Sequence, residues 1–327
     1  LRIYGYNNIE IPEKINSSPS IPKLKSNHSI QQKISNHLVS LGAYEIMNNS
    51  LVKREYGNFL DEKSNNHISL LNPLSNDTST LRKSLIYGAV EVLKFNHFNG
   101  NPNGTIFEWG KVYSENRNEY EQENRLLIAT TGLQNEEHWF NGKLESSFFQ
   151  LKGIIESVFK SLGIYYETKI LTKDHLWEEG LSLIKGKYRL ATVGKVRKEI
   201  SNLIGFKKHY FISEIYFDNL MEIIANSKPK IKPINKFQKV YRDLSILIPE
   251  DVTMLEIKNS IDQVKSKLLK NTTLFDIYRD KKNIGKKAYG LRFEFLHSER
   301  TLKDQEVDSV MNSIQSKLED KFNAALR

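Results

Sequence analysis

The sequence predicts an α+β protein made of a larger body and a smaller tail. Its segments alternate between helical and strand periodicity without the regular strand–helix repeat of a parallel sheet. Two proline-containing segments, residues 7–23 and 226–235, show little periodicity and divide the 327 residues into separate parts. We therefore expect an arm, a body, a linker and a tail, over residues 1–22, 23–226, 227–235 and 236–327.

Composition places the sequence among globular proteins and excludes several kinds of chemistry. Hydrophobic residues make up 39% and charged residues 27%, and no apolar run approaches the length of a membrane span. The lack of cysteine excludes disulfides, thiolate nucleophiles and Cys-ligated metals, and it agrees with a cytoplasmic location. Because the sequence starts at Leu1 without a signal peptide, we expect it to be a piece of a longer protein.

The net charge of +9 is concentrated in the last third of the sequence. Residues 228–327 contain 21 Lys and Arg against 14 Asp and Glu, a net charge of +7, which leaves +2 for residues 1–227. A compact basic domain is a typical footprint of polyanion binding. A solvated basic surface without a ligand explains the same excess, and charge alone does not separate the two.

The pattern of the body predicts helices packed on an antiparallel sheet. Helix 29–41 is ended by Gly42 and helix 148–162 by Gly163, as in C-terminal glycine caps. A third helix is expected over residues 80–98, whose apolar residues recur at helical spacing. The strands expected are 43–52, 107–113, 126–131, 190–196 and 211–217, with a charged loop over 114–125.

The tail has the clearest periodicity. A strand containing Leu244, Ile246 and Ile248 precedes a helix that Thr253 caps and that carries apolar residues as far as Leu268. Two strands, a second helix after Thr301 or Asp304 and a short closing strand follow, over residues 274–279, 291–295, 304–322 and 324–327. This β-α-β-β-α-β order is that of the ferredoxin-like fold, which packs both helices on one sheet face and leaves the other face open.

The residues supply no self-contained active site. The sequence has no glycine-rich phosphate loop, no HExxH motif and no pair of histidines at ligand spacing. Its adjacent acids, Glu136–Glu137 and Glu178–Glu179, diverge in either a strand or a helix. The motifs therefore predict neither a catalytic residue nor a metal ligand.

Three stretches, in the expected order, resemble the beta subunit of bacterial phenylalanyl-tRNA synthetase. Residues 2–9 (RIYGYNNI) resemble the end of its B5-type domain. Residues 71–85 (LNPLSNDTSTLRKSL) and 107–113 (FEWGKVY) resemble its catalytic-like body. Parts of the tail resemble its ferredoxin-like anticodon-binding domain, namely the residues around Arg242-Asp243, Leu274–Arg279 and Glu299–Val307. The resemblance covers essentially the whole sequence.

The resemblance implies a beta-subunit piece that works with a catalytic alpha subunit in a cytoplasmic (αβ)₂ enzyme. That enzyme uses ATP and Mg to attach phenylalanine to tRNA-Phe. In the family, the editing domain and the acidic residues associated with magnesium lie upstream of residues 2–9, so no metal, cofactor or editing residue is assigned here. The alternative is a free-standing RNA-binding protein derived from a synthetase module.

The resemblance also gives the body the class II synthetase fold. Active members hold ATP between a motif-two arginine on a hairpin and a motif-three arginine that opens a helix after a glycine-rich strand. Arg117 and Arg125 are candidates for the first, but the GxGxGxR pattern of the second is missing. We therefore expect an inactive, catalytic-like body that docks on the alpha subunit. Helices 80–98 and 148–162 are expected at that interface or, alternatively, in the body's own core.

The tail is expected to bind the anticodon region of tRNA-Phe through the open sheet face and its margins. Aromatic side chains there stack on unpaired bases and cations contact phosphates. Tyr241 stands where a second arginine is common in the family. A purely structural role, with pairing to acids and loop carbonyls, is the alternative for Arg242, Asp243 and Arg279. The residues expected to contact tRNA are Arg279, Arg292, Tyr278, Arg242, Lys281, Lys282, Lys286 and Lys287.

Overall fold

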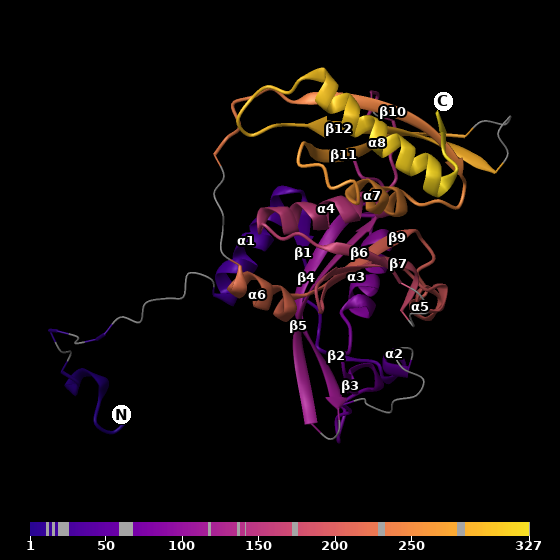
Figure 1. The fold of residues 1–327 in the computed structure, drawn as a ribbon. Coiled ribbons are helices and arrows are strands. Elements are labelled where there is room, and N and C mark those ends of the chain that lie inside the picture. Colours follow the sequence, from indigo (N-terminus) through magenta and orange to yellow (C-terminus); the bar gives the residue numbers. More distant parts are fainter. Residues whose placement is uncertain are drawn as a thin grey trace. The chain divides into compact units, whose positions relative to one another are not determined.

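The chain forms two compact units, Leu1–Pro229 and Lys230–Arg327 (Figure 1). Among the residues that the structure describes, no helix is both long and apolar enough to cross a membrane. This computed structural model describes residues 1–10, 13–14, 17–18, 26–58, 68–116, 119–135, 138–140, 142–171, 176–227, 233–279 and 285–326.

The first unit, the body, is built on a seven-stranded sheet with the order β1-β4-β5-β9-β8-β7-β6. β1 runs parallel to β4, and every other neighbouring pair in this sheet is antiparallel. The short strands β2 and β3 pair with each other in a separate sheet. The bounds are β1 (Ala43–Glu45), β2 (Leu51–Val52), β3 (Thr80–Leu81), β4 (Gly104–Asn116), β5 (Glu119–Thr131), β6 (Glu167–Ile170), β7 (Trp177–Lys185), β8 (Tyr188–Val196) and β9 (Tyr210–Tyr216).

Helices cover both faces of the seven-stranded sheet. One core contains buried residues of α1 (Asn27–Ser40), α4 (Phe148–Ser161) and α6 (Phe217–Asn226) together with Phe107, Leu126 and Ile128 of the central strands. The opposite core contains residues of α3 (Ile86–Phe98) and α5 (Lys198–Ile204). The remaining helical segments are η1 (Tyr6–Asn8), α2 (Arg54–Asn58) and η2 (Asn76–Thr78).

The charged loop predicted over residues 114–125 is wrong, because β4 continues as far as Asn116 and β5 begins at Glu119. Their paired residues extend from Gly104–Thr131 to Asn116–Glu119. The outer part of β5 is exposed and only its inner half is buried. Since that outer part packs against no core, its polar sequence lacks strand alternation, although backbone hydrogen bonds hold it in the hairpin.

The helix predicted over residues 80–98 begins later, at Ile86. Thr80 and Leu81 form β3 instead, opposite β2. The strand predicted over 43–52 is likewise divided into β1 and β2, which pair with different partners. The sequence pattern also missed β6, β7 and α5, whereas α1 and α4 match the predicted helices closely.

The second unit, the tail, has the predicted β-α-β-β-α-β order. Its antiparallel sheet has the strand order β11-β12-β10-β13. Buried residues of both helices pack with Ile246, Leu291 and Phe293 in one core, so the helices share one face of the sheet (Figure 1). The bounds are β10 (Val240–Pro249), α7 (Met254–Asp262), β11 (Leu269–Tyr278), β12 (Lys286–Phe295), α8 (Asp304–Phe322) and β13 (Ala325–Leu326).

The first tail helix is shorter than its apolar spacing predicts. Thr253 and Glu256 form a reciprocal capping box at the start of α7, as the sequence indicates. The helix ends at Asp262, and Lys265 adopts a left-handed φ of 52° soon afterwards. Val264 and Leu268 still pack against the core, but from the connection to β11.

A carboxylate at the start of α8 makes the stability of the tail depend on pH. Hydrogen bonds from Arg300 and from the backbone N–H of Lys303 lower the pKa of Glu306 to about 2. A depressed folded-state pKa stabilises the native state above the ordinary carboxyl pKa of about 4.5 and loses that effect as the pH falls toward 2.

We therefore expect Glu306→Gln to weaken the protection of α8 amides at neutral pH, with the difference from the parent disappearing between about pH 4.5 and 2. Hydrogen-exchange mass spectrometry of the full chain, comparing variant with parent at each pH, measures this. Glu299→Gln is the control, because Glu299 is exposed and its carboxylate forms no ion pair within the described residues. A difference that stays constant with pH contradicts the assignment.

Candidate functional site

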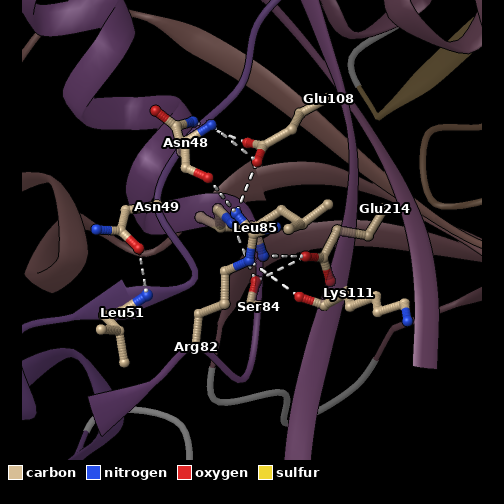
Figure 2. A network of polar contacts seen from close by, with 10 residues as sticks. Asn48, Asn49, Leu51, Arg82, Ser84, Leu85, Glu108, Lys111 and Glu214 are labelled. Atoms are coloured by element: carbon tan, nitrogen blue, oxygen red, sulfur yellow. Dashed lines mark hydrogen bonds and ion pairs between the residues drawn. The ribbon is translucent and has the colours of Figure 1, made fainter. Parts of the chain in front are cut away.

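A buried ion pair ties the segment before α3 to the central hairpin of the body (Figure 2). Arg82 donates through Nη1 to Oε1 of Glu108 at 2.6 Å and through Nε to the carbonyl oxygen of Lys111 at 2.9 Å. Glu108 also accepts a 2.8 Å hydrogen bond from the side-chain amide of Asn48. The exposed fractions of the Arg82 and Glu108 side chains are 7% and 1%. The charge of Arg82 is therefore neutralised inside the domain.

A second buried carboxylate, Glu214 on β9, organises the neighbouring part of this network. Its Oε1 accepts from the Ser84 hydroxyl at 2.7 Å and from the backbone N–H of Leu85 at 2.8 Å (Figure 2). Its Oε2 accepts from Nη1 of Arg125 at 3.1 Å. Arg125 also donates through Nη2 to Glu123 at 2.6 Å. One carboxylate thus fixes both the residues before α3 and an arginine of the hairpin.

These contacts determine what Arg125 does. Its guanidinium carbon also lies 4.0 Å from the centre of the Tyr216 ring. Burial by itself lowers the pKa of Arg125, but Glu214, Tyr216 and Glu123 outweigh it and raise that pKa above its ordinary value. Arg125 is therefore a structural cation held by two carboxylates, and this arrangement does not fit an ATP phosphate. The other motif-two candidate, Arg117, lies outside the described residues.

The sheet face that carries these carboxylates is packed interior. A row of directly paired residues crosses five strands there and is buried along its whole length: Glu108, Leu127, Glu214, Thr192 and Ser182. Apolar residues of α3 pack against this face. Within the described residues, the hydroxyls of Tyr87, Ser182 and Thr192 are buried without a hydrogen-bond partner. Burial, and then the charge of Glu214, raise the pKa of Tyr87, so its phenol stays neutral.

Because removal of one partner leaves the other charge buried, we expect Glu108→Ala to destabilise the body by about 3–5 kcal/mol. Urea unfolding followed by tryptophan fluorescence measures this loss, since all three tryptophans, Trp109, Trp139 and Trp177, belong to the body. Glu115→Ala, on the same strand, is the matched control and is expected to change stability by less than about 0.5 kcal/mol. Equal effects of the two substitutions contradict the role of the buried pair.

The open face of the tail sheet carries an arginine, an aspartate and a phenylalanine side by side. Arg292 on β12 donates through Nε and Nη2 to the two carboxylate oxygens of Asp243 on β10, both at 2.7 Å. This bidentate pair lowers the pKa of Asp243. The guanidinium carbon of Arg292 lies 5.4 Å from the centre of the Phe275 ring. Gly290 leaves room for that ring, because a Cβ there would lie 2.9 Å from it.

Exposed aromatic side chains surround this pair. Phe275, Tyr241 and Tyr278 have exposed fractions of 54%, 49% and 45%. The register places Tyr278 beside Ala288 and Tyr241 beside Glu294, on the face opposite to the helices. The face therefore offers flat rings around a guanidinium that two hydrogen bonds hold in place, a surface on which unpaired bases can stack.

The predicted contact residues fall into three groups. Arg292, Tyr278 and Lys286 belong to the open face, and Arg279 lies beyond the end of β11, paired with Glu250 at 2.8 Å. Arg242 and Lys287 lie on the helix-bearing side instead: Arg242 pairs with Asp304 at 2.6 Å, and the buried Lys287 donates to the Glu250 carbonyl at 2.6 Å. Lys281 and Lys282 lie outside the described residues.

Sequence reasoning missed Phe275 as a candidate residue. The pairing of β11 with β12 shifts between Leu274 and Asp276, so both Phe275 and Asp276 lie against Gly290. Strict alternation would have placed Phe275 and Asp276 on opposite faces. Of the aromatic residues on this face, the sequence analysis chose Tyr278 as a contact and noted Tyr241 only because it stands where an arginine is common in the family.

Two family models identify the class of protein, the aminoacyl-tRNA synthetase chains with a ferredoxin-fold domain. Residues 235–327 match the family model described as "Ferredoxin-fold anticodon binding domain". Residues 11–217 match the model described as "Phenylalanyl tRNA synthetase beta chain CLM domain". The chain belongs to the phenylalanyl-tRNA synthetase beta chain family, which confirms the resemblance found in the sequence.

Curated relatives agree with this assignment over the whole chain. The phenylalanine–tRNA ligase beta subunit of Bacteroides thetaiotaomicron is 33% identical over 342 residues, covering 100% of this chain and 42% of the relative. Those of Porphyromonas gingivalis and Clostridium acetobutylicum are each 30% identical, again over 100% of this chain, with 42% and 41% of their own lengths covered. The chain thus spans about two fifths of the curated relatives that it matches.

Proposed function

We propose that this chain is a non-catalytic part of the beta subunit of phenylalanine–tRNA ligase, which binds the anticodon end of tRNA-Phe through its tail. The observation that carries the proposal is the open face of the anticodon-binding domain, where Phe275, Tyr241 and Tyr278 surround Arg292. Unpaired anticodon bases stack on the rings, while Arg279 and Lys286 meet phosphates at the margin. The helix-side residues Arg242 and Lys287 are left out of this contact.

In this proposal the chemistry belongs to a separate catalytic alpha subunit, in an (αβ)₂ enzyme of the cytoplasm that uses ATP and Mg. The residues of the body do not fit ATP, because Arg125 is bound by Glu123 and Glu214 and the sheet face beside it is packed with apolar side chains. We derive no step through ATP on this chain. The body acts as a scaffold for tRNA and for the alpha subunit.

The structure also changes which residues we propose for the alpha-subunit contact. Helices α3 and α4 bury most of their apolar residues in the body's own cores, which is the alternative considered for them in the sequence. Phe95 and Phe98 of α3 and Phe149 of α4 nevertheless stay exposed, with exposed fractions of 67%, 72% and 79%. Apolar side chains are also uncovered outside these helices: Met47, Leu71 and Leu74 have exposed fractions of 93%, 98% and 103%. Such residues are suited to a permanent protein interface.

The purified chain is expected to show only background ATP–pyrophosphate exchange in the presence of phenylalanine, because its hairpin arginine is held by carboxylates. The complex with the alpha subunit is the positive control. A robust exchange rate from the chain alone, abolished by Arg125→Ala, would falsify the scaffold assignment.

Phe275→Ala and Tyr278→Ala in the whole synthetase are each expected to weaken tRNA-Phe binding by about 1–3 kcal/mol, because each removes a stacking surface. The salt dependence of binding should stay the same, since no phosphate contact is lost. Ile277→Ala is the matched control, because Ile277 lies between them in sequence but pairs with Tyr289 on the helix-bearing side. Fluorescence anisotropy with labelled tRNA across a salt series measures both quantities; parent-like affinity in both aromatic variants rules out this face.

A further inference from the structure

A small basic cavity lies in the body at the junction of β8, α5 and the start of β9. Its volume is about 230 Å³. No Asp or Glu contributes to its lining. The lining residues are Lys195, Val196, Lys198, Ser201, Asn202, Lys207, Lys208, His209 and Tyr210. Four lysines and a histidine therefore converge on one concave site in a unit whose overall charge is close to neutral.

The floor of the cavity is polar and ordered. The hydroxyls of Ser201 and Tyr210 are joined by a 2.6 Å hydrogen bond. Burial raises the pKa of Tyr210, so its phenol remains a neutral hydrogen-bonding group. Asn202, which is exposed, adds a side-chain amide to the lining. Hydroxyl, amide and ammonium groups lining one cavity are the chemistry that recognises a phosphate.

The lysines of this site differ in how far their charge is already neutralised. Lys195 pairs with Glu178 at 3.1 Å, and Lys198 approaches the same carboxylate at 3.8 Å. Lys207 and Lys208 are exposed, and neither pairs with a carboxylate within the described residues. By contrast, the arginines proposed for the tail face are paired with Asp243 and Glu250. The ammonium groups of these two lysines are therefore available to bind a phosphate group of another molecule.

A second cavity adjoins the first. This hollow of about 350 Å³ shares Lys208 and His209 with the first cavity, and its lining also contains His97 and one carboxylate, Glu145. Lys208 and His209 therefore form a ridge between two adjoining hollows. A linear polyanion that crosses such a ridge places successive phosphates on both sides of it, which a single free phosphate cannot do.

We propose that Lys207 and Lys208 at this cavity bind two phosphates of the tRNA backbone, as a second RNA contact in addition to the tail face. The inference rests on the proposed function, because the ligand is the tRNA that the tail is proposed to bind. It adds a sequence-independent contact from the body, which fixes the position of the tRNA without reading bases.

The test compares two double substitutions in the whole synthetase. Lys207→Gln/Lys208→Gln removes the proposed contacts, and Lys185→Gln/Lys187→Gln removes the same charge from the β7–β8 turn, outside both cavities. We expect the first to weaken tRNA-Phe binding about 10- to 50-fold near 0.1 M salt and to flatten the log–log salt slope by roughly 1.4 to 1.8. The control pair should change neither by more than a small fraction of this, and circular dichroism verifies folding.

Further outcomes separate this inference from the proposed function. If Phe275→Ala weakens binding while the Lys207/Lys208 variant behaves like the control pair, the body contact is overturned and the tail contact stands. If the parent synthetase binds no tRNA-Phe, both this inference and the proposed function are wrong. Calorimetric titration with inorganic phosphate tests the other source of the same chemistry: saturable binding lost only in the Lys207/Lys208 variant, with tRNA binding unchanged, replaces the RNA assignment by a free-phosphate site.

Discussion

The body depends on two carboxylates, Glu108 and Glu214, that are buried in the same row across the middle of its sheet. An ionised carboxylate in a protein interior is strongly destabilising unless donors surround it. Three of the donors, Arg82, Ser84 and the backbone N–H of Leu85, come from the segment that leads into α3. Asn48 and Arg125 supply the others. This requirement explains why the helix begins at Ile86, because the residues just before it reach the two carboxylates from outside the helix. The helix that follows then covers the sheet face.

The buried carboxylates also bind two arginines of the body, so these arginines are not available for the chemistry of a synthetase. Arg82 is neutralised by Glu108, and Arg125 is held between Glu123 and Glu214. The row of polar side chains that continues to Thr192 and Ser182 lies under apolar residues rather than at a solvent-filled cleft. The interactions that stabilise the body thus occupy Arg125, which favours the scaffold role proposed above.

The tail was more predictable from sequence than the body because its signals are local. Alternation in β10 and β12 and the capping box at Thr253 identify its elements without long-range information. The same alternation places Arg242 with Leu244 and Lys287 with Tyr289 on the helix side, so both were separable from Arg292 in the sequence itself. Phe275 was not, because a bulge in β11 is set by pairing with β12. In the body, the hairpin beyond the core and the start of α3 depend on partners distant in sequence, so periodicity misplaced both.

The net charge of a domain does not show how many of its cations are available to bind a ligand. The tail carries most of the positive excess, yet Arg242, Arg279 and Arg292 are each paired with acids of their own domain. A paired guanidinium positions rings and bases well, but it adds little attraction at a distance, because the field of the pair falls off steeply and is screened by salt. Lys207 and Lys208 belong to the nearly neutral body and still keep their charge for a ligand. In the proposals made above, the tail therefore contributes base stacking with phosphate contacts at its margin, and the body adds a contact with phosphates alone.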